Sequence, residues 1–262
     1  RELMSHTGGL MYTPPLGNGP IATAYAEAGI MNLPGYTLAE SIPALADIPL
    51  SYQPGTQWVY SISVDVQGYM VERLSGQTFD EFLKERLFDP LGMSDTAFYV
   101  APEKADRLAR QYRPNQDGSL QRTDTGAFLN PPKFLSGGGG LTSTTADYMK
   151  FAQMHLNGGE YNGVRILSEE AVQHMRSNQL PDAVENIGQL YPGNVFGLDF
   201  AIVENSAAYQ GAPEGTHWWW GIAGSWFWID PVENIVFIGM IQNDDILYSL
   251  QVHGGARAAI YQ

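Results

Sequence analysis

The chain has 262 residues, a length that suits one large domain or two interleaved lobes, and its 44% hydrophobic and 16% charged residues exclude a disordered or fibrous protein. Twenty-eight acidic against 14 basic residues give a net charge of −14, which disfavours binding to nucleic acid and to anionic membrane surfaces. The absence of Cys excludes thiol catalysis, and no apolar run is long enough to predict a membrane span.

The first part of the chain is predicted to be helical and rich in loops. Residues 1–57 contain many Pro and Gly and indicate loops around short helices, whereas residues 101–136 are polar and indicate irregular structure. Apolar spacing, capping residues and glycine stops predict helices at about 61–75, from Thr78 to a stop at Pro90, at about 146–156 and at about 169–177.

The last part is predicted to be an antiparallel meander, because β-branched and aromatic residues dominate from Phe196 onward. We expect strands near 196–204, 215–221, 224–230 and 234–242, followed by a closing helix at about 246–260. The predicted fold class is therefore α+β, with a mostly helical lobe over 1–190 and an antiparallel sheet covered by the C-terminal helix over 191–262. Such a sheet has a thin core, so we expect further strands from outside this chain.

Several common catalytic and binding motifs do not occur. The chain has no G-x-S-x-G nucleophile elbow, no phosphate-binding G-x-x-x-x-G-K-[ST] and no zinc-binding H-E-x-x-H. Its five His residues are scattered without metal-ligand spacing. The sequence therefore predicts neither a metal site nor a cofactor.

The most informative stretch runs from Pro54 to Gly68. A Pro-Gly turn is followed by Tyr60 immediately before the first long predicted helix, where a tyrosine hydroxyl can project into a cleft. Considered alone, this pattern favours a core tyrosine whose hydroxyl is satisfied within the protein.

This stretch resembles the tyrosine motif of the serine β-lactamase-like superfamily, which includes class C β-lactamases, DD-peptidases and family VIII carboxylesterases. Further segments resemble that superfamily's motifs in the same order: Leu3–Leu10 its LLTHTSGL, Pro90–Thr96 its PLGM-x-DT, Gly138–Tyr148 its GGGL-x-ST-x-x-D, Arg165–Ser168 its R-x-L-S and Trp220–Pro231 the WGGAAGTWFWVDP of its esterase-like members. The six collinear matches cover nearly the whole chain, and the family VIII carboxylesterases are the most similar members.

The resemblance implies acyl-enzyme chemistry, in which the Ser of an S-x-x-K motif attacks a carbonyl group. Tyr60 would take the Ser proton and later give it to the leaving group, assisted by the Lys. Trp220, Gly221 and Ile222 would occupy the place of the family's K-T-G or W-G-G triplet and bind substrate. The backbone N–H of Ala223 would then be one of the two oxyanion donors.

The chain departs from the family pattern in three places. It contains no S-x-x-K, a motif that the family places upstream of LLTHTSGL, so we expect the chain to be the C-terminal part of a longer protein. Ile222 stands where Gly is usual, which would narrow the cleft. Ile62 replaces the Asn of the family's Y-x-N, which favours esters over β-lactams.

The sequence therefore predicts a serine hydrolase for carboxylic esters, either a carboxylesterase or an acyl transferase. The expected substrate is a small ester or amide, and the expected partner is an N-terminal fragment or second chain that carries the Ser/Lys pair. A β-lactamase or DD-peptidase is one alternative. A catalytically inactive binding or assembly module is the other, because S-x-x-K is absent and Ile222 replaces Gly.

Overall fold

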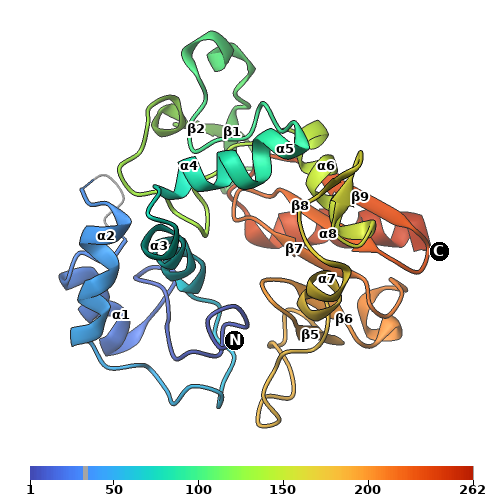
Figure 1. Ribbon diagram of the computed structural model, residues 1–262, viewed down its shortest axis with the longest axis horizontal. Helices are drawn as coiled ribbons and strands as arrows, with labels where there is room; N and C mark the ends of the chain where they lie inside the picture. The colour runs from blue at the N-terminus through green and yellow to red at the C-terminus, as the bar shows by residue number, and fades with distance from the viewer. Residues whose placement is uncertain (32–34, 262) are drawn as a thin grey trace.

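The computed structural model describes residues 1–31 and 35–261, and Figure 1 shows their arrangement. The α-helices are α1 Gly19–Glu27, α2 Leu38–Ser41, α3 Ser63–Ser75, α4 Phe79–Leu83, α5 Asp89–Leu91, α6 Thr145–Leu156, α7 Glu169–Met175 and α8 Ile246–Tyr261. The strands are β1 Gln111–Pro114, β2 Leu120–Thr123, β3 Glu160–Tyr161, β4 Val164–Arg165, β5 Asn194–Phe196, β6 Ala201–Val203, β7 His217–Trp220, β8 Trp226–Asp230 and β9 Ile235–Gly239.

The last five strands form one antiparallel sheet in the order β5-β6-β7-β8-β9. Each strand pairs with the next one along the chain, so the predicted meander is confirmed. The register places Trp218 opposite Trp228, and Trp228 opposite Phe237. The rings of Trp228 and Phe237 stack with their centroids 4.1 Å apart, which adds aromatic contact energy to the backbone ladder.

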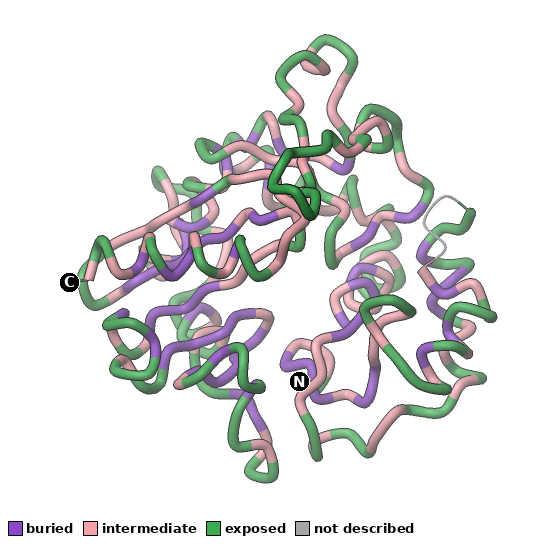
Figure 2. Tube along the Cα trace, turned by 180° about the vertical axis from the view of Figure 1, so that it is seen from behind, coloured by how far each residue is buried: buried purple, intermediate pink, exposed green. Residues whose placement is uncertain are grey.

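A helix covers each face of this sheet. On one face, α6 packs through Ala152 against Phe227 and Ile229 of β8. On the other face, α8 packs through Val252 and Ala256 in a cluster that includes the tryptophans of β7 and β8. The central strands are therefore buried on both sides, as the purple segments in Figure 2 show.

The remaining helices begin and end near the residues that the sequence predicts. Gly76 ends α3 in the left-handed conformation with φ +74°, which a residue without Cβ adopts freely. The hydroxyl of Thr144 accepts a hydrogen bond from the amide of Asp147 and caps α6, and Ser168 caps α7 through the amide of Ala171. The predictions from local capping chemistry are therefore confirmed for these helices.

Two predictions about the backbone are wrong. Residues 196–204 are not one strand, because the chain turns between β5 and β6 where the amide of Gly197 donates to the carbonyl of Phe200 and Asp199 takes φ +61°. Residues 101–136 are not wholly irregular, because β1 and β2 form a hairpin across the turn in which Asn115 donates to Ser119. Both errors come from short turns, which β-propensity summed over a window does not detect.

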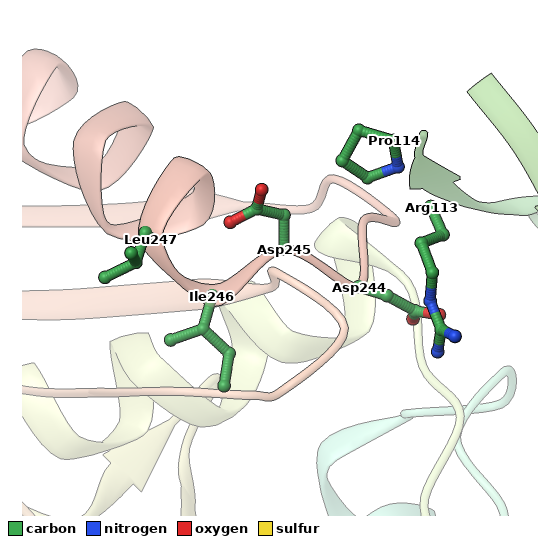
Figure 3. A pocket seen from close by; sticks show the side chains of 6 residues that line it. All are labelled: Arg113, Pro114, Asp244, Asp245, Ile246 and Leu247. Atoms are coloured by element: carbon green, nitrogen blue, oxygen red, sulfur yellow. The ribbon is translucent and has the colours of Figure 1, made fainter. Parts of the chain in front are cut away.

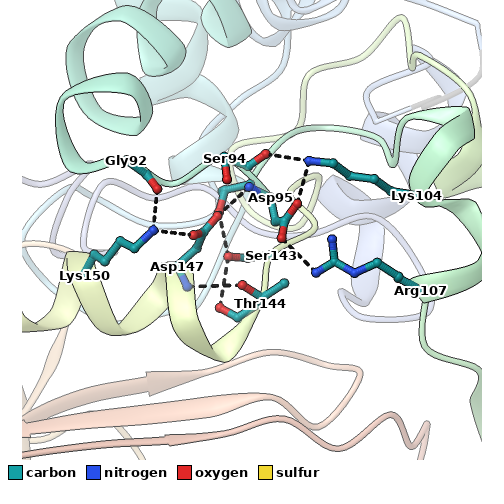
Figure 4. Close-up of polar contacts among 10 residues, drawn as sticks. Gly92, Ser94, Asp95, Lys104, Arg107, Ser143, Thr144, Asp147 and Lys150 are labelled. Atoms are coloured by element: carbon teal, nitrogen blue, oxygen red, sulfur yellow. Dashed lines mark hydrogen bonds and ion pairs between the residues drawn. The ribbon is translucent and has the colours of Figure 1, made fainter.

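A network of ion pairs fastens the segment after α5 to the start of α6 (Figure 4). The carboxylate of Asp95 binds Lys104 at 2.6 Å and Arg107 at 2.8 Å. Asp147, in the first turn of α6, binds Lys150 at 2.9 Å and accepts from the amide of Asp95 at 2.6 Å. The PLGM-x-DT and GGGL-x-ST-x-x-D segments are thus held together by charge-assisted hydrogen bonds.

The helices α1, α2 and α3 gather on one side of the molecule, and the five-stranded sheet lies on the other. The N-terminus lies between these two parts in Figures 1 and 2. Among the helices of the described residues, none combines the length and the apolar character that crossing a membrane requires. The boundary at residue 190 between the two predicted lobes stays a prediction.

Candidate active site

Tyr60 lies at the junction of the helical part and the sheet. It comes three residues before α3, and its ring packs against the rings of His6, Tyr12 and Trp219 with centroid distances of 4.7, 5.6 and 5.0 Å. The indole Nε1–H of Trp219, on β7, donates a hydrogen bond of 3.2 Å to the Tyr60 hydroxyl. The structure therefore brings the tyrosine motif and the tryptophan-rich strand together at the phenolic oxygen.

The surroundings of Tyr60 favour the protonated phenol. Burial raises the pKa of Tyr60, and the charges of Asp65 and Asp199 raise it further. Hydrogen bonding to Trp219 and Tyr12 acts in the opposite direction, because these donors stabilise the phenolate. Within the described residues, the hydroxyl thus has donors directed at it, but no positive charge is among the groups that shift its pKa.

Asp65, in the first turn of α3, is a fully buried carboxylate near this tyrosine. Its Oδ1 accepts from the hydroxyl of Ser136 at 2.6 Å and from the amide of Gly138 at 3.4 Å. Its Oδ2 is buried and has no hydrogen-bond partner among the described residues. Burial raises the pKa of Asp65, as expected for a carboxylate that lacks a matching positive charge.

Asp199 is a second, half-buried carboxylate in this region, and the sequence analysis missed it. Its Oδ1 accepts a hydrogen bond of 3.0 Å from Gln67 of α3, and burial raises its pKa to about 7. Two acidic side chains thus place negative potential around Tyr60, an arrangement that stabilises a cation nearby. No motif in the sequence marks Asp199, because only the turn between β5 and β6 brings it to α3.

The turn between β7 and β8 carries the predicted substrate-binding residues. Strand β7 ends at Trp220, so Gly221 and Ile222 lie in the turn and not on a strand, contrary to the prediction. The turn is closed by a hydrogen bond of 2.7 Å from the amide of Gly221 to the carbonyl of Ser225. The amides of Ile222 and Ala223 donate no hydrogen bond to another residue in the part of the chain that the structure describes. Free amides at a turn are the donors that an oxyanion hole requires.

The contact with Tyr60 comes from Trp219, whereas the sequence analysis selected its neighbour Trp220. The indole of Trp220 instead donates to the hydroxyl of Tyr191 at 3.1 Å. Counting back without a gap from Asp230-Pro231 along WGGAAGTWFWVDP places Trp219, not Trp220, at the first letter. By the same count, the residue directly after the W-G-G triplet, which would supply the oxyanion donor, is Ile222 and not Ala223. The free amides of both residues are therefore candidate oxyanion donors.

A separate pocket lies at the start of α8 (Figure 3). It is lined by Arg113, Pro114, Asp244, Asp245, Ile246 and Leu247. Arg113 and Asp244 form an ion pair of 3.1 Å across it, and Tyr60 is not among the residues that line it. Across residues 1–31 and 35–261, no three His, Asp or Glu side chains are grouped to hold a metal ion. The titratable groups around Tyr60 therefore form the better candidate site.

Comparison with solved structures identifies the fold. EstCE1, described as a hydrolase with promiscuous acyltransferase activity, superposes on all of this chain with a TM-score of 0.82 and 24% identity, and the match covers 71% of EstCE1. The predicted α+β fold of the β-lactamase and transpeptidase type is thereby confirmed, and the chain corresponds to part of the longer EstCE1 chain.

Sequence comparison agrees with the fold. An uncharacterized Mycobacterium tuberculosis protein is 35% identical over 92% of the chain, and esterase EstB of Burkholderia gladioli is 30% identical over 86%. The chain spans only about three fifths of these relatives, namely 61% and 60% of their lengths. The family model described as Beta-lactamase matches residues 1–253. The chain therefore belongs to the beta-lactamase family, a hydrolase family with esterase and acyltransferase members.

Proposed function

We propose that the protein is a serine hydrolase or acyl transferase that acts on carboxylic esters, with Tyr60 as its proton-transfer residue. The observation that carries this proposal is the 3.2 Å hydrogen bond from Trp219 to the Tyr60 hydroxyl, which joins two family motifs that are 159 residues apart in the sequence. The hydroxyl of a purely structural tyrosine can be satisfied by a hydrogen-bond partner from any part of the fold. Here the partner, Trp219, lies on β7, the strand that ends at the turn with the two free amides.

The nucleophile is proposed to come from a segment upstream of Arg1, either on the same polypeptide or on a separate fragment. The N-terminus lies between the helices and the sheet, and His6 already contacts the Tyr60 ring. A segment that enters there reaches the phenolic oxygen over a short distance. The share of its relatives that this chain spans supports a Ser/Lys pair outside it.

The carboxylates near Tyr60 support a lysine as the missing cation. The Oδ2 of Asp65 is buried without a partner in the described residues, and the charges of Asp65 and Asp199 both raise the pKa of Tyr60. An ammonium group in this space would gain Asp65 as partner and would lower the pKa of Tyr60, because a nearby positive charge favours the phenolate. Tyr60 would then be able to accept a proton near neutral pH.

The proposed reaction forms an acyl-enzyme and then releases the acyl group, with Tyr60 carrying the proton in both steps. The phenolate of Tyr60 takes the proton of the Ser hydroxyl while the Ser oxygen bonds to the ester carbonyl carbon, and the negative charge moves to the carbonyl oxygen. An amide of the β7–β8 turn, at Ile222 or Ala223, stabilises this oxyanion. The bond to the leaving alcohol then breaks, and Tyr60 returns the proton to the departing oxygen. Water or an acceptor alcohol repeats the sequence to release the acyl group.

Substrate selection is proposed to occur at the same turn. The side chain of Ile222 is 56% exposed, and Trp220 and Gly221 precede it at the mouth of the hairpin. By the gap-free count, Ile222 stands at the first Ala of WGGAAGTWFWVDP and Trp220 at its first Gly, so two bulky side chains narrow the approach to the turn. This arrangement favours small esters over the larger substrates of peptidases.

The test uses the intact protein, including any segment upstream of Arg1. We expect rapid hydrolysis of p-nitrophenyl acetate or butyrate, little turnover of a chromogenic cephalosporin, and fluorophosphonate labelling of one Ser that mass spectrometry places upstream of Arg1. Faster turnover of the cephalosporin than of the esters would indicate a β-lactamase or peptidase instead. Absence of both labelling and turnover would indicate an inactive binding module.

A further inference from the structure

The side chain of His6 is hydrogen-bonded to Ser61, the residue that follows Tyr60. Its Nδ1 accepts a hydrogen bond of 3.2 Å from the backbone amide of Ser61, and the Ser61 hydroxyl lies 3.2 Å from the same nitrogen. The hydroxyl of Ser63, at the start of α3, is 2.8 Å from that of Ser61. Because the amide can only donate, Nδ1 is the acceptor and the ring proton resides on Nε2.

The backbone of His6 is hydrogen-bonded to Val59, the residue that precedes Tyr60. Its carbonyl accepts from the amide of Val59 at 3.0 Å and from the hydroxyl of Tyr52 at 3.2 Å. His6 has a φ of +54°, the left-handed conformation, in which its carbonyl and its ring both face the same extended segment. One residue thus binds the chain immediately before and immediately after Tyr60.

His6 does not act on Tyr60 through charge. Its side chain is 1% exposed, and burial lowers its pKa to about 3, so the ring is neutral in the working range of an esterase. Its ring centroid lies 4.7 Å from that of Tyr60 at a tilt of 51°, which is a packing contact. Its contribution to Tyr60 is therefore geometric.

We propose that His6 is a positioning residue for the reaction, which holds the backbone on both sides of Tyr60 so that the phenolic oxygen stays within reach of Trp219 and of the incoming nucleophile. This inference rests on the proposed role of Tyr60. The hydroxyl lies at the far end of a long side chain, so a small rotation of the backbone at residues 59–61 displaces it by a large fraction of an ångström. Misplacement of a catalytic group by about 1 Å costs up to about a hundredfold in rate.

Two substitutions at His6 separate positioning from mere packing. In His6→Asn the amide group occupies the place of Nδ1, and Asn tolerates the left-handed conformation. In His6→Gln the polar group shifts to the place of Nε2, so the bond to the Ser61 amide is lost. We expect His6→Gln to lower kcat by about 10- to 100-fold with KM within about twofold, and His6→Asn to retain kcat within about threefold of wild type.

The experiment measures ester hydrolysis by the intact protein, with rates normalised by fluorophosphonate titration of active sites so that unfolded material does not contribute. His155→Asn is the matched control, because His155 is also buried but its ring contacts in the described residues are Phe151, Phe200 and His217 and do not include Tyr60 or Trp219. We expect this control to lower Tm while kcat per titrated site stays at the wild-type value.

A double variant completes the test. If His6 acts through Tyr60, then His6→Gln lowers kcat in the wild-type background but has no further effect in a Tyr60→Phe background. Equal losses of kcat in both backgrounds, or equal kcat values for His6→Asn and His6→Gln, would overturn the positioning role while leaving Tyr60 in the mechanism. Wild-type kcat in Tyr60→Phe alone would instead overturn the proposed function, and the role of His6 with it.

Discussion

Asp65 and Asp147 are both buried carboxylates in the first turn of a helix, but their surroundings differ. Both oxygens of Asp147 have partners: Lys150 binds Oδ1 at 2.9 Å, and the amide and hydroxyl groups of residues 95 and 96 bind Oδ2 at 2.6 and 3.2 Å. Asp65 has partners for Oδ1 only, and its Oδ2 is buried without one in the described residues. A saturated carboxylate stabilises the fold, whereas an unsaturated one beside a buried tyrosine indicates a place where another group binds.

The largest effect is expected at the tyrosine beside the unsaturated carboxylate. Tyr60→Phe removes the oxygen that exchanges the proton but keeps the ring that packs against His6 and Trp219. We expect kcat for p-nitrophenyl esters to fall by about 10²- to 10⁴-fold in the intact protein, with Tm nearly unchanged. Steady-state kinetics and thermal unfolding check this, and ester turnover close to that of the wild type would remove Tyr60 from the mechanism.

Matched substitutions of the two carboxylates test the comparison itself. Asp147→Asn leaves Lys150 without its counter-charge, so we expect the free energy of unfolding to fall by about 2–3 kcal/mol. Asp65→Asn removes a desolvated charge, so we expect it to change stability by less than about 1 kcal/mol and to lower kcat by about tenfold.

Urea unfolding and ester kinetics on both variants distinguish the two roles. A stability loss at Asp65 as large as that at Asp147, with kcat intact, would show that both carboxylates are merely structural. The comparison is sharpened if a crystal structure of the intact protein shows a lysine at the Oδ2 atom of Asp65.

A smaller effect is expected from the indole that contacts Tyr60. Trp219→Phe removes the donor to the phenolic oxygen, and because a hydrogen bond to a charged group contributes about 1.5–3 kcal/mol, kcat should fall about tenfold or somewhat more. The acid limb of the pH–rate profile should also move to higher pH, because Tyr60 acts as the phenolate and its pKa rises when this donor is lost.

Trp220→Phe is the matched variant on the same strand, since its indole donates to Tyr191. We expect it to raise KM with little change in kcat, in agreement with a substrate-binding position. If instead Trp220→Phe lowered kcat more than Trp219→Phe, the gap-free alignment of the tryptophan run would be wrong.

The smallest effect is expected at the exposed part of the ion-pair network. Hydrogen bonds from Arg107 and Lys104 hold the pKa of Asp95 well below its usual value. An acid with a lowered folded-state pKa stabilises the protein above its unfolded pKa of about 4, and this stabilisation is lost as the pH falls through the folded value. Asp95→Asn should therefore lower Tm by about 1–3 °C at pH 7. The difference from wild type should shrink below pH 4, and a difference that is constant over this range would exclude the ion pairs as its cause.

The sequence was sufficient for features that depend on local chemistry. Capping residues and glycine stops predicted α3, α6 and α7, and the dominance of β-branched and aromatic residues after Phe196 predicted the antiparallel meander. It was insufficient where a short turn decides the outcome. The turn at Asp199 divides one predicted strand into two, and the turn after Trp220 removes Gly221 and Ile222 from the strand.

The candidate site shows the same limit. Tyr60 could be selected because its motif is contiguous in the sequence, but Trp219, Asp199 and the ring of His6 meet it only through tertiary contacts. Three consecutive tryptophans offer no local signal for which indole faces the tyrosine, since adjacent residues on a strand point to opposite faces. The pairing of β7 with β8 and the docking of the tyrosine segment against the sheet decide it.

The most direct test of the central claim is a crystal structure of the intact protein with a covalently bound alkyl phosphonate. The account predicts a labelled Ser from upstream of Arg1 with its Oγ about 3 Å from the Tyr60 hydroxyl, and a phosphonate oxygen within about 3 Å of the amide of Ile222 or Ala223. A labelled residue more than about 6 Å from the Tyr60 hydroxyl, or a phosphonate held away from the β7–β8 turn, would contradict it.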